Sequence, residues 1–473
     1  MDAPLFFLAA LALLALPAAA PRAPAAPIAQ NSPASTPSSN EVSLDWFLDH
    51  PSLFSASLEE FEKAFPPGTA TWLDKEKTRA RFNPDRTALK LRGQEGGETI
   101  VSFKVGKIAG VMISVMNKGD DGLIKEAPFK KAISSARATL QEIAKVTEAP
   151  RKKNETISKA DGLVWSTKQA LYMLEYLWVP EERRDGYIWY AHGEFVRIRI
   201  LPPQILLGVQ QNTLKTNISR PSLAKRVKKE GTAVWIEGLP MVDQGSKGYC
   251  AVASFERVMR YYGSQVDMHD LADLANTNSF GTSPDGIKDA VHKMAVRSGL
   301  HSREPIFMES KDFASLKNAY NREAKKQKQG EVSDPSGIAS LYRDMDPDLL
   351  LAMRAKDPGL AKFGSEVARS INAGIPLMWA LQLGMFWEDH LEDSFEASRG
   401  TPASSPKPPA SPSERPKRPP EFMSGGHMRL IIGYDPKEKL IFYTDSWGPG
   451  HEKKQMSLQE AWAVTMGLFI VEP

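Results

Sequence analysis

Cys250 is the only cysteine of this 473-residue chain, and it stands where an amphipathic helix is predicted to begin. Apolar side chains recur after it at three- and four-residue spacing, which is typical of a helix with one buried face. The unpaired N–H groups and the dipole of a helix start stabilise an anion, so they lower the pKa of a thiol there. A single cysteine forms no internal disulfide. We therefore interpret Cys250 as a nucleophile, with a buried structural cysteine as the alternative.

The segment before Cys250 contains residue types that suit the same chemistry. Gln244 can donate an amide N–H to an oxyanion that develops beside the sulfur, and the backbone N–H of Cys250 would be the second donor. Gly245 and Gly248 allow the backbone to turn tightly and to approach a substrate closely. The pattern predicts an oxyanion hole at this helix start.

His427 is the best placed of the eight histidines to act as the base. Two glycines precede it, which leaves it sterically open. It begins a predicted strand, 427–434, and a turn separates that strand from a second one, 440–444. The two strands together predict a hairpin.

Asp445 is the candidate partner of His427 in this hairpin. If Tyr434 pairs with about residue 439, His427 lies opposite residue 445 or its neighbour. Asp445 would then orient the imidazole and stabilise its charged form. Trp447 follows and would shield the pair from water. An ordinary turn without a catalytic part is the alternative for this segment.

The other candidate bases and metal ligands are weaker. His390 and His451 lie in charged loops and are alternative bases, whereas His269 and His292 lie on charged faces of predicted helices and are expected to be inert. A zinc protein is the weakest class, because one cysteine and scattered histidines offer no close pair of ligands. No metal or cofactor is therefore expected.

The charge balance argues against two classes of partner. Sixty basic and 57 acidic residues leave a net charge of +3, which is too balanced for nucleic acid or an anionic membrane as the main partner. The hydrophobic fraction of 42% is ample for two or three domains. No segment after the first twenty residues is apolar over a length that spans a membrane.

The first twenty residues resemble a signal peptide. An apolar run, 5–16, precedes the small residues 18–20, although Asp2 stands where a basic residue is expected. We expect export to the periplasm or the extracellular space, with an apolar tail that stays attached as the alternative. Residues 21–42 are rich in Pro, Ala and Ser and are predicted to be a linker.

The remaining chain is predicted to form two α+β domains. Residues 43–209 form the first, whose role as a propeptide, docking module or spacer is left open, and 210–232 form a basic linker. Residues 233–473 form the second, with a helical half that carries the cysteine and an antiparallel β half that carries the histidine. Within it, 301–360 is predicted to be mostly helical. The Pro-rich stretch 393–420 is predicted to be a disordered insertion.

Three segments together resemble the papain-like cysteine peptidase superfamily. They are Gln244 with Gly248-Tyr-Cys250, then Gly425-Gly-His427, then Asp445-Ser-Trp-Gly448. The C39-like branch is the more similar one, through Gly248–Ser254, Tyr261–Gly263, Gly281–Ser283, Ala373–Pro376 and Gly426–Asp435. The resemblance covers about half of the chain. The local Gly-Tyr-Cys-Ala pattern departs from that of papain, and Asp replaces its Asn.

The resemblance implies a peptidase that hydrolyses peptide bonds of a peptide or protein substrate. Cys250 would be the nucleophile, His427 the general base and acid, Asp445 the orienting residue and Gln244 the oxyanion donor. Two other functions remain open: a different thiol acyl-transfer enzyme (an amidase or a transglutaminase), and a catalytically inactive papain-like binding module. The residues predict neither the cleavage specificity nor the oligomeric state.

Overall fold

The two largest hydrophobic cores of the described chain are separate in sequence, one within residues 44–200 and one within 223–471. The computed structural model describes residues 41–473 except 85, 151–159, 185–186, 204–217, 246–247, 265, 267, 269–270, 273–283, 334, 389–417 and 420–424. The described residues belong to one compact unit, which spans 32–473. We call the parts around the two cores the N-terminal region (41–203) and the C-terminal region (218–473). Both are mixed α+β.

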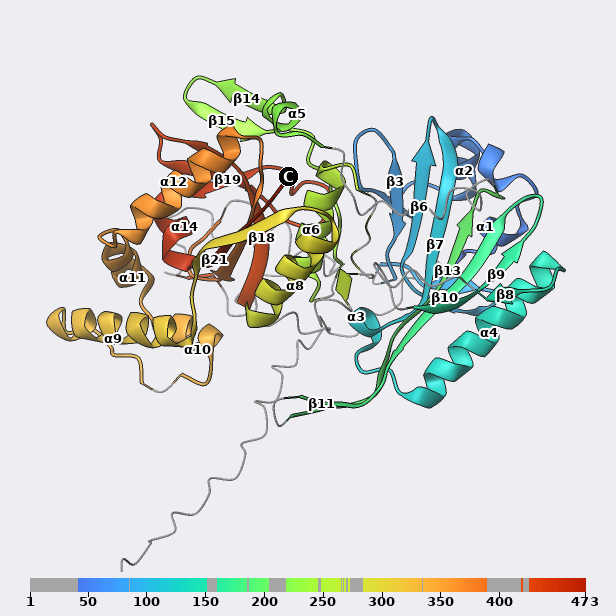
Figure 1. Cartoon of the computed structure of the whole chain (residues 1–473), viewed down its shortest axis with the longest axis horizontal. Helices are drawn as coiled ribbons and strands as arrows, with labels where there is room; N and C mark the ends of the chain where they lie inside the picture. The colour runs from blue at the N-terminus through green and yellow to red at the C-terminus, as the bar shows by residue number, and fades with distance from the viewer. Residues whose placement is uncertain are drawn as a thin grey trace, which may run out of the picture. The chain divides into compact units, whose positions relative to one another are not determined.

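An antiparallel sheet of eight strands dominates the N-terminal region, in the order β2-β3-β6-β7-β13-β10-β9-β8 (Figure 1). Its strands are β2 (Thr71–Trp72), β3 (Arg79–Phe82), β6 (Thr99–Lys104), β7 (Lys107–Asn117), β8 (Ala149–Pro150), β9 (Asp161–Ser166), β10 (Leu171–Val179) and β13 (His192–Leu201). Helix α4 (Glu126–Ala144) packs across β10 and β13 through buried Phe129, Ala136 and Leu140. Helix and sheet together give this region the α+β character predicted for it.

Short elements complete the N-terminal region. They are β1 (Val42–Ser43), α1 (Trp46–Asp49), the 3-10 helix η1 (Leu53–Ser55), α2 (Leu58–Ala64), β4 (Leu89–Leu91), β5 (Gln94–Gly96), α3 (Lys118–Asp121), β11 (Glu182–Arg184) and β12 (Tyr187–Trp189). Ser57 and Glu60 form a reciprocal capping box that fixes the start of α2.

The C-terminal region contains a second antiparallel sheet, in the order β14-β15-β18-β17-β21-β16, with β19 and β20 added beside β18. Its strands are β14 (Val227–Glu230), β15 (Ala233–Ile236), β16 (His301–Phe307), β17 (Leu377–Leu383), β18 (Gly425–Asp435), β19 (Leu440–Thr444), β20 (Lys454–Ser457) and β21 (Thr465–Glu472). Its helices are α5 (Arg220–Ala224), α6 (Cys250–Tyr261), α8 (Pro284–Arg297), α9 (Ser310–Lys326), α10 (Ile338–Asp344), α11 (Pro347–Arg354), α12 (Gly359–Asn372) and α14 (Leu458–Val464). Both α6 and α12 pack against β18.

Two predictions in the C-terminal region need refinement. Residues 301–360 are mostly helical, as predicted, with α9, α10 and α11, but 301–307 form β16, an edge strand paired with β21. Residues 220–230 of the expected linker form α5 and the edge strand β14. Edge strands tolerate prolines, bulges and charged side chains, which weaken the alternating signal in the sequence.

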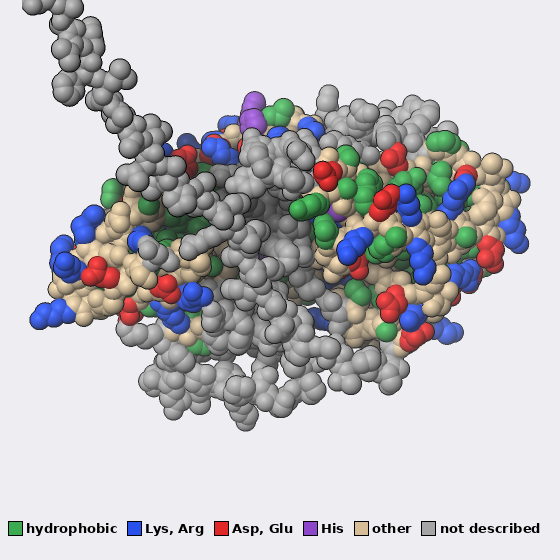
Figure 2. Space-filling view, turned by 90° about the horizontal axis from the view of Figure 1, so that it is seen from below, with side chains coloured by type: hydrophobic (Ala, Val, Ile, Leu, Met, Phe, Trp, Pro, Cys, Tyr) green, Lys and Arg blue, Asp and Glu red, His purple; other side chains and the backbone are tan. Residues whose placement is uncertain are grey.

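Other expectations fall outside the described residues, in whole or in part. These are the signal peptide 1–20, nearly all of the linker 21–42 and nearly all of the insertion 393–420. None of the helices in the described ranges is long and apolar enough to cross a membrane. On the face seen in Figure 2, the described basic and acidic side chains are interspersed, as the balanced composition suggests.

Candidate active site

Cys250 is the first residue of α6, and its side chain is half-buried. The helix buries almost every side chain from Ala251 to Tyr261, so its position is set by packing rather than by its own propensity. Ser254 donates a hydrogen bond to the carbonyl of Met428, one residue beyond His427 on β18 (3.3 Å). The helix that carries the thiol is therefore joined directly to the strand that carries the imidazole.

The thiol and the imidazole share a hydrogen bond, and each shifts the pKa of the other. Burial raises the pKa of Cys250, but the hydrogen bond and charge of His427 and the backbone N–H groups of Met428 and Ala251 outweigh it, so the thiol pKa is lowered. Burial lowers the pKa of His427, yet Asp445 and Cys250 together raise it to about 8. These shifts favour a thiolate–imidazolium pair near neutral pH.

His427 also binds Asp445 through the opposite side of its ring. Its Nε2 lies 3.0 Å from Asp445 Oδ1, which leaves Nδ1 as the nitrogen that can face the sulfur. The Trp447 ring stacks on the imidazole with 4.6 Å between ring centres. The imidazole is thus held at its edge by Asp445 and on one face by Trp447.

The register of the hairpin differs from the expected one. Tyr434 pairs with Ile441 rather than with residue 439, and a bulge between Ile431 and Gly433 changes the register before the last pair, Leu430 with Thr444. Asp445 lies just beyond the end of β19 and still reaches His427. A bulge adds a residue to one strand, and a count along an ideal ladder does not include it.

Asp445 is fully buried among three positive groups. Arg429 Nε donates to Oδ1 at 2.8 Å, and Lys454 Nζ lies 3.5 Å from Oδ2. Burial would raise the pKa of Asp445, but Arg429, His427 and Lys454 outweigh it and hold that pKa far below its usual range. The carboxylate is therefore ionised at neutral pH.

Arg429 and Lys454 are residues that sequence reasoning missed. Arg429 follows His427 by two positions on β18, so both side chains lie on one face of the strand. It also pairs with Glu388 at 2.7 Å and lies over the ring of Tyr443. The spacing of two residues from His427 on a predicted strand was the sequence signal that could have indicated Arg429.

Arg257, on α6, was also missed. It is fully buried and donates to the carbonyls of Pro240 (2.8 Å) and Asp445 (2.6 Å) and to Thr444 Oγ1 (2.7 Å). Burial lowers its pKa to about 10, which still leaves it charged at neutral pH. The guanidinium fixes the helix of the nucleophile to the segment of the orienting aspartate.

Gln244 is buried beside Ser446, the residue after Asp445. Its backbone N–H donates to the carbonyl of Ser446 at 2.8 Å, and its Oε1 accepts from Ser446 Oγ at 2.7 Å. Because Oε1 accepts this bond, the amide nitrogen lies on the other arm of the side chain. The structure thus brings all four candidate residues to one end of α6: Gln244, Cys250, His427 and Asp445.

Of the other candidate histidines, His451 lies beside this arrangement, with its ring edge-on to Trp447 (5.6 Å between ring centres) and its carbonyl accepting from the Asp445 N–H. His451 Nδ1 accepts from Lys454 at 2.7 Å, and burial, with the charge of Lys454, lowers its pKa to about 4. His292 is exposed and bonds to Ser302. His269 and His390 lie outside the described residues.

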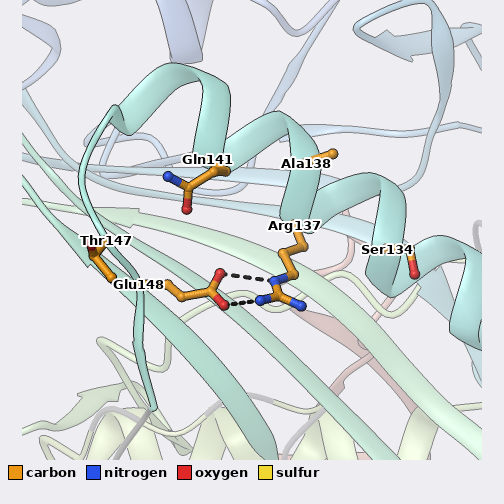
Figure 3. Close-up of a pocket in the computed structure, with 6 residues that line it drawn as sticks. All are labelled: Ser134, Arg137, Ala138, Gln141, Thr147 and Glu148. Atoms are coloured by element: carbon orange, nitrogen blue, oxygen red, sulfur yellow. Dashed lines mark hydrogen bonds and ion pairs between the residues drawn. The ribbon is translucent and has the colours of Figure 1, made fainter.

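A potential metal site and a surface pocket were the other candidates for a functional site. The part of the chain that the structure describes contains no group of three His, Cys, Asp or Glu side chains that could hold a metal ion. A surface pocket lies beside α4 and contains the ion pair of Arg137 and Glu148 (Figure 3). It has no nucleophile next to a base, so it offers no catalytic chemistry.

Comparison with known proteins relates the C-terminal region to one family. Residues 236–467 match the model of the Peptidase_C39 like family. A crystal structure of xylellain, a cysteine protease from Xylella fastidiosa, is similar at 12% sequence identity and a TM-score of 0.25, over 55% of this chain and 91% of that chain. A search of curated proteins finds no match. Residues 236–467 are thus similar to a C39-like peptidase domain.

Proposed function

We propose that the protein is a cysteine peptidase that hydrolyses peptide bonds with Cys250, His427, Asp445 and Gln244. The observation that carries the proposal is the hydrogen-bonded chain from the thiol through His427 to Asp445, with the pKa of the thiol lowered and that of the imidazole raised. A structural cysteine needs neither shift. The match to a peptidase family supports the same chemistry.

The reaction would begin with attack of the Cys250 thiolate on the carbonyl carbon of the scissile bond. Negative charge then develops on the carbonyl oxygen, where the Gln244 amide and the Cys250 backbone N–H would donate hydrogen bonds. His427, as imidazolium, gives its proton to the leaving amine and becomes neutral. It next takes a proton from water as that water attacks the thioester, which releases the carboxylic acid and regenerates the thiol pair.

Asp445 would hold the imidazole in place without accepting a proton. Its pKa is far too low for protonation during the cycle. Arg429 and Lys454 would keep it ionised, and Arg257 would keep its backbone fixed to α6. The aspartate therefore acts through the orientation and charge of His427.

Alkylation by iodoacetamide tests the activated thiol directly, because the reaction requires the thiolate. The rate measured across pH should give a Cys250 pKa below the ordinary thiol value, and His427→Ala should raise it. An unshifted pKa that is the same in both proteins would sink the proposal. Hydrolysis of a mixed peptide library by the wild type but not by Cys250→Ala would then identify a peptidase.

A different acyl-transfer activity is separated in the same assay. With a primary amine present, a transglutaminase yields an amide product, whereas hydrolysis by a peptidase or an amidase yields the free acid. A binding module without catalysis would leave every activity unchanged in Cys250→Ala.

We further propose export by residues 1–20, for which the N-terminal sequence of the secreted protein is the test.

A further inference from the structure

The loop between residues 243 and 249 carries Gln244 and leads into Cys250, and both of its ends contact the N-terminal region. Its first end meets Arg81 of β3. Its second end meets Asn117 and Gly119, at the junction of β7 and α3. The peptidase domain therefore does not hold the loop alone.

Arg81 binds the first end through Asp243, the residue before Gln244. Its guanidinium is buried, with Nε on Glu98 and Nη1 on Asp243 Oδ2, both at 2.5 Å. Burial alone would lower the pKa of Arg81, but Glu98 and Asp243 more than offset this and raise it. The charged guanidinium of Arg81 thus bridges Glu98 of the N-terminal region and Asp243 of the C-terminal region.

The backbone at Gly245 lies close to this guanidinium. Asp243 Oδ1 accepts from the N–H of Gly245 at 2.9 Å, which closes a tight turn around Gln244. Gly245 has a φ of +67°, and a Cβ there would lie 2.4 Å from Arg81 Nη2. Only glycine allows both the left-handed backbone and the close approach of the arginine.

The same carboxylate also meets the loop that carries Trp447. A Cβ on Gly448, where φ is +87°, would lie 3.0 Å from Asp243 Oδ2. Asp243 therefore fills the space between Arg81, the turn of Gln244 and the segment that follows Asp445. One carboxylate therefore contacts both loops.

Tyr249 fixes the second end of the loop. It is the N-cap residue of α6 and is buried, and its hydroxyl donates to Asn117 Oδ1 at 3.0 Å. The ring presses on Gly119, where a Cβ would lie 2.7 Å from the Tyr249 Cζ atom. The residue directly before the nucleophile is thus anchored in the N-terminal region.

We propose that Arg81, Asn117 and Gly119 are positioning residues for the oxyanion loop, so that the N-terminal region is a permanent part of the catalytic unit. The inference rests on the proposed peptidase function and deepens it. It also separates two roles of the N-terminal region that the sequence left open. If the N-terminal region were a propeptide that is removed on activation, its removal would leave Asp243 without Arg81 and Tyr249 without Asn117. Activity would then fall when the region is removed.

The first test replaces Arg81 by lysine in the full chain. Lysine keeps the charge but loses the fork that joins Glu98 and Asp243. Arg197→Lys is the control, because Arg197 is equally buried in the same region and pairs with Glu175, away from the loop. Arg81→Lys should lower kcat about 10- to 100-fold with KM within about threefold, since displacement of an oxyanion donor weakens the transition state selectively.

Two inhibitors separate positioning of the loop from general damage. A peptide aldehyde forms a tetrahedral adduct whose oxygen occupies the oxyanion hole, whereas iodoacetamide alkylation requires only the thiolate. Arg81→Lys should weaken the aldehyde about 10-fold or more and leave the alkylation rate and its pH midpoint unchanged. Equal loss of both, or loss of neither, contradicts the role of Arg81 at the oxyanion loop.

The second test acts at the other end of the loop. Gly119→Ala places a methyl group against the Tyr249 ring. Gly110→Ala is the control, because the closest contact of its Cβ would be the flexible end of Leu201 at 3.2 Å. Hydrogen exchange of residues 242–249 should be faster in Gly119→Ala and Arg81→Lys than in the two controls. Unchanged exchange in both variants overturns the inference.

Failure of the inference and failure of the proposed function give different results. If the wild type neither hydrolyses peptides nor reacts as an activated thiol, the peptidase proposal fails, yet the exchange measurement still reports whether the N-terminal region holds the loop. If the wild type is active and all four variants match it in kcat and exchange, the peptidase stands and the positioning role is wrong.

Discussion

Each region of the molecule contains a buried histidine that is bonded to a carboxylate. In the N-terminal region His192 Nε2 lies 2.8 Å from Glu194, and in the C-terminal region His427 Nε2 lies 3.0 Å from Asp445. Both histidines have the same exposed fraction, 8%. Distance and burial therefore do not distinguish the two pairs.

The second ring nitrogen does distinguish them. His192 Nδ1 donates to the carbonyl of Tyr190 at 2.8 Å, and Lys118 also reaches Nε2, so both nitrogens are engaged by the fold. The other side of the His427 ring faces the thiol of Cys250. A histidine–carboxylate pair becomes a catalytic candidate when its remaining nitrogen faces a reactive group rather than the backbone.

The largest expected effect separates the two histidines. Cys250→Ala and His427→Ala should each lower kcat for peptide hydrolysis by about 10³-fold or more, because the nucleophile or its proton donor is lost. His192→Ala should keep kcat within about fivefold for the folded protein. Steady-state kinetics with circular dichroism as the folding control checks this. Equal losses at the two histidines would remove the distinction between the pairs.

Asp445→Asn should have the next largest effect, on both catalysis and stability. The neutral amide no longer balances Arg429 and Lys454 or favours the imidazolium, so we expect a kcat about 100-fold lower and an unfolding free energy lower by about 3 kcal/mol. Glu194→Gln should lower the unfolding free energy without a comparable loss of kcat. Urea titration and kinetics on both variants measure the contrast. An unaffected kcat in Asp445→Asn would rule out the orienting role.

The pH dependence should follow the raised pKa of His427. Peptide hydrolysis requires the imidazolium, so kcat/KM should fall about tenfold per pH unit above about pH 8. The same shift contributes stability that is complete below about pH 6.5 and is lost as pH rises through about 8, since the folded state favours the protonated ring. Rate and urea-midpoint profiles between pH 5 and pH 10 test both signs. A rate that rises through pH 9 would contradict the imidazolium.

The smallest expected effect concerns the stacked ring of Trp447. Trp447→Leu removes the aromatic face from His427 and admits water to the His427–Asp445 pair, so we expect kcat to fall about three- to tenfold. The pKa of His427, followed by NMR, should move towards its ordinary value. A variant with wild-type kcat and an unchanged histidine signal would show that the stack is only packing.

The sequence predicted the strands and helices that have a clear periodic pattern. The start of α6 at Cys250 and the hairpin of β18 and β19 followed from apolar spacing and a short turn. The hairpin register did not, because the bulge after Ile431 leaves no mark in residue type. The edge strand β16 was missed because its charges and its proline hide the alternation.

The site was predictable in its reactive groups but not in their supports. Thiol, imidazole and carboxylate have recognisable chemistry, so spacing and residue type were enough to nominate them. Arg257 and Arg429 resemble ordinary charged residues in the sequence, and only the fold shows that both are buried against Asp445. Arg81 lies 162 residues before Asp243, and no local pattern relates two such distant positions.

The single cysteine has a practical consequence for redox chemistry. With no second thiol in the chain, an oxidised Cys250 cannot be resolved by an internal disulfide, so a sulfenic acid or a mixed disulfide would persist until an external reductant removes it. Any thiol-specific label also reports on one position alone. The intact mass after labelling therefore counts active sites directly, and the fraction labelled before and after reduction measures how much of a preparation has been oxidised.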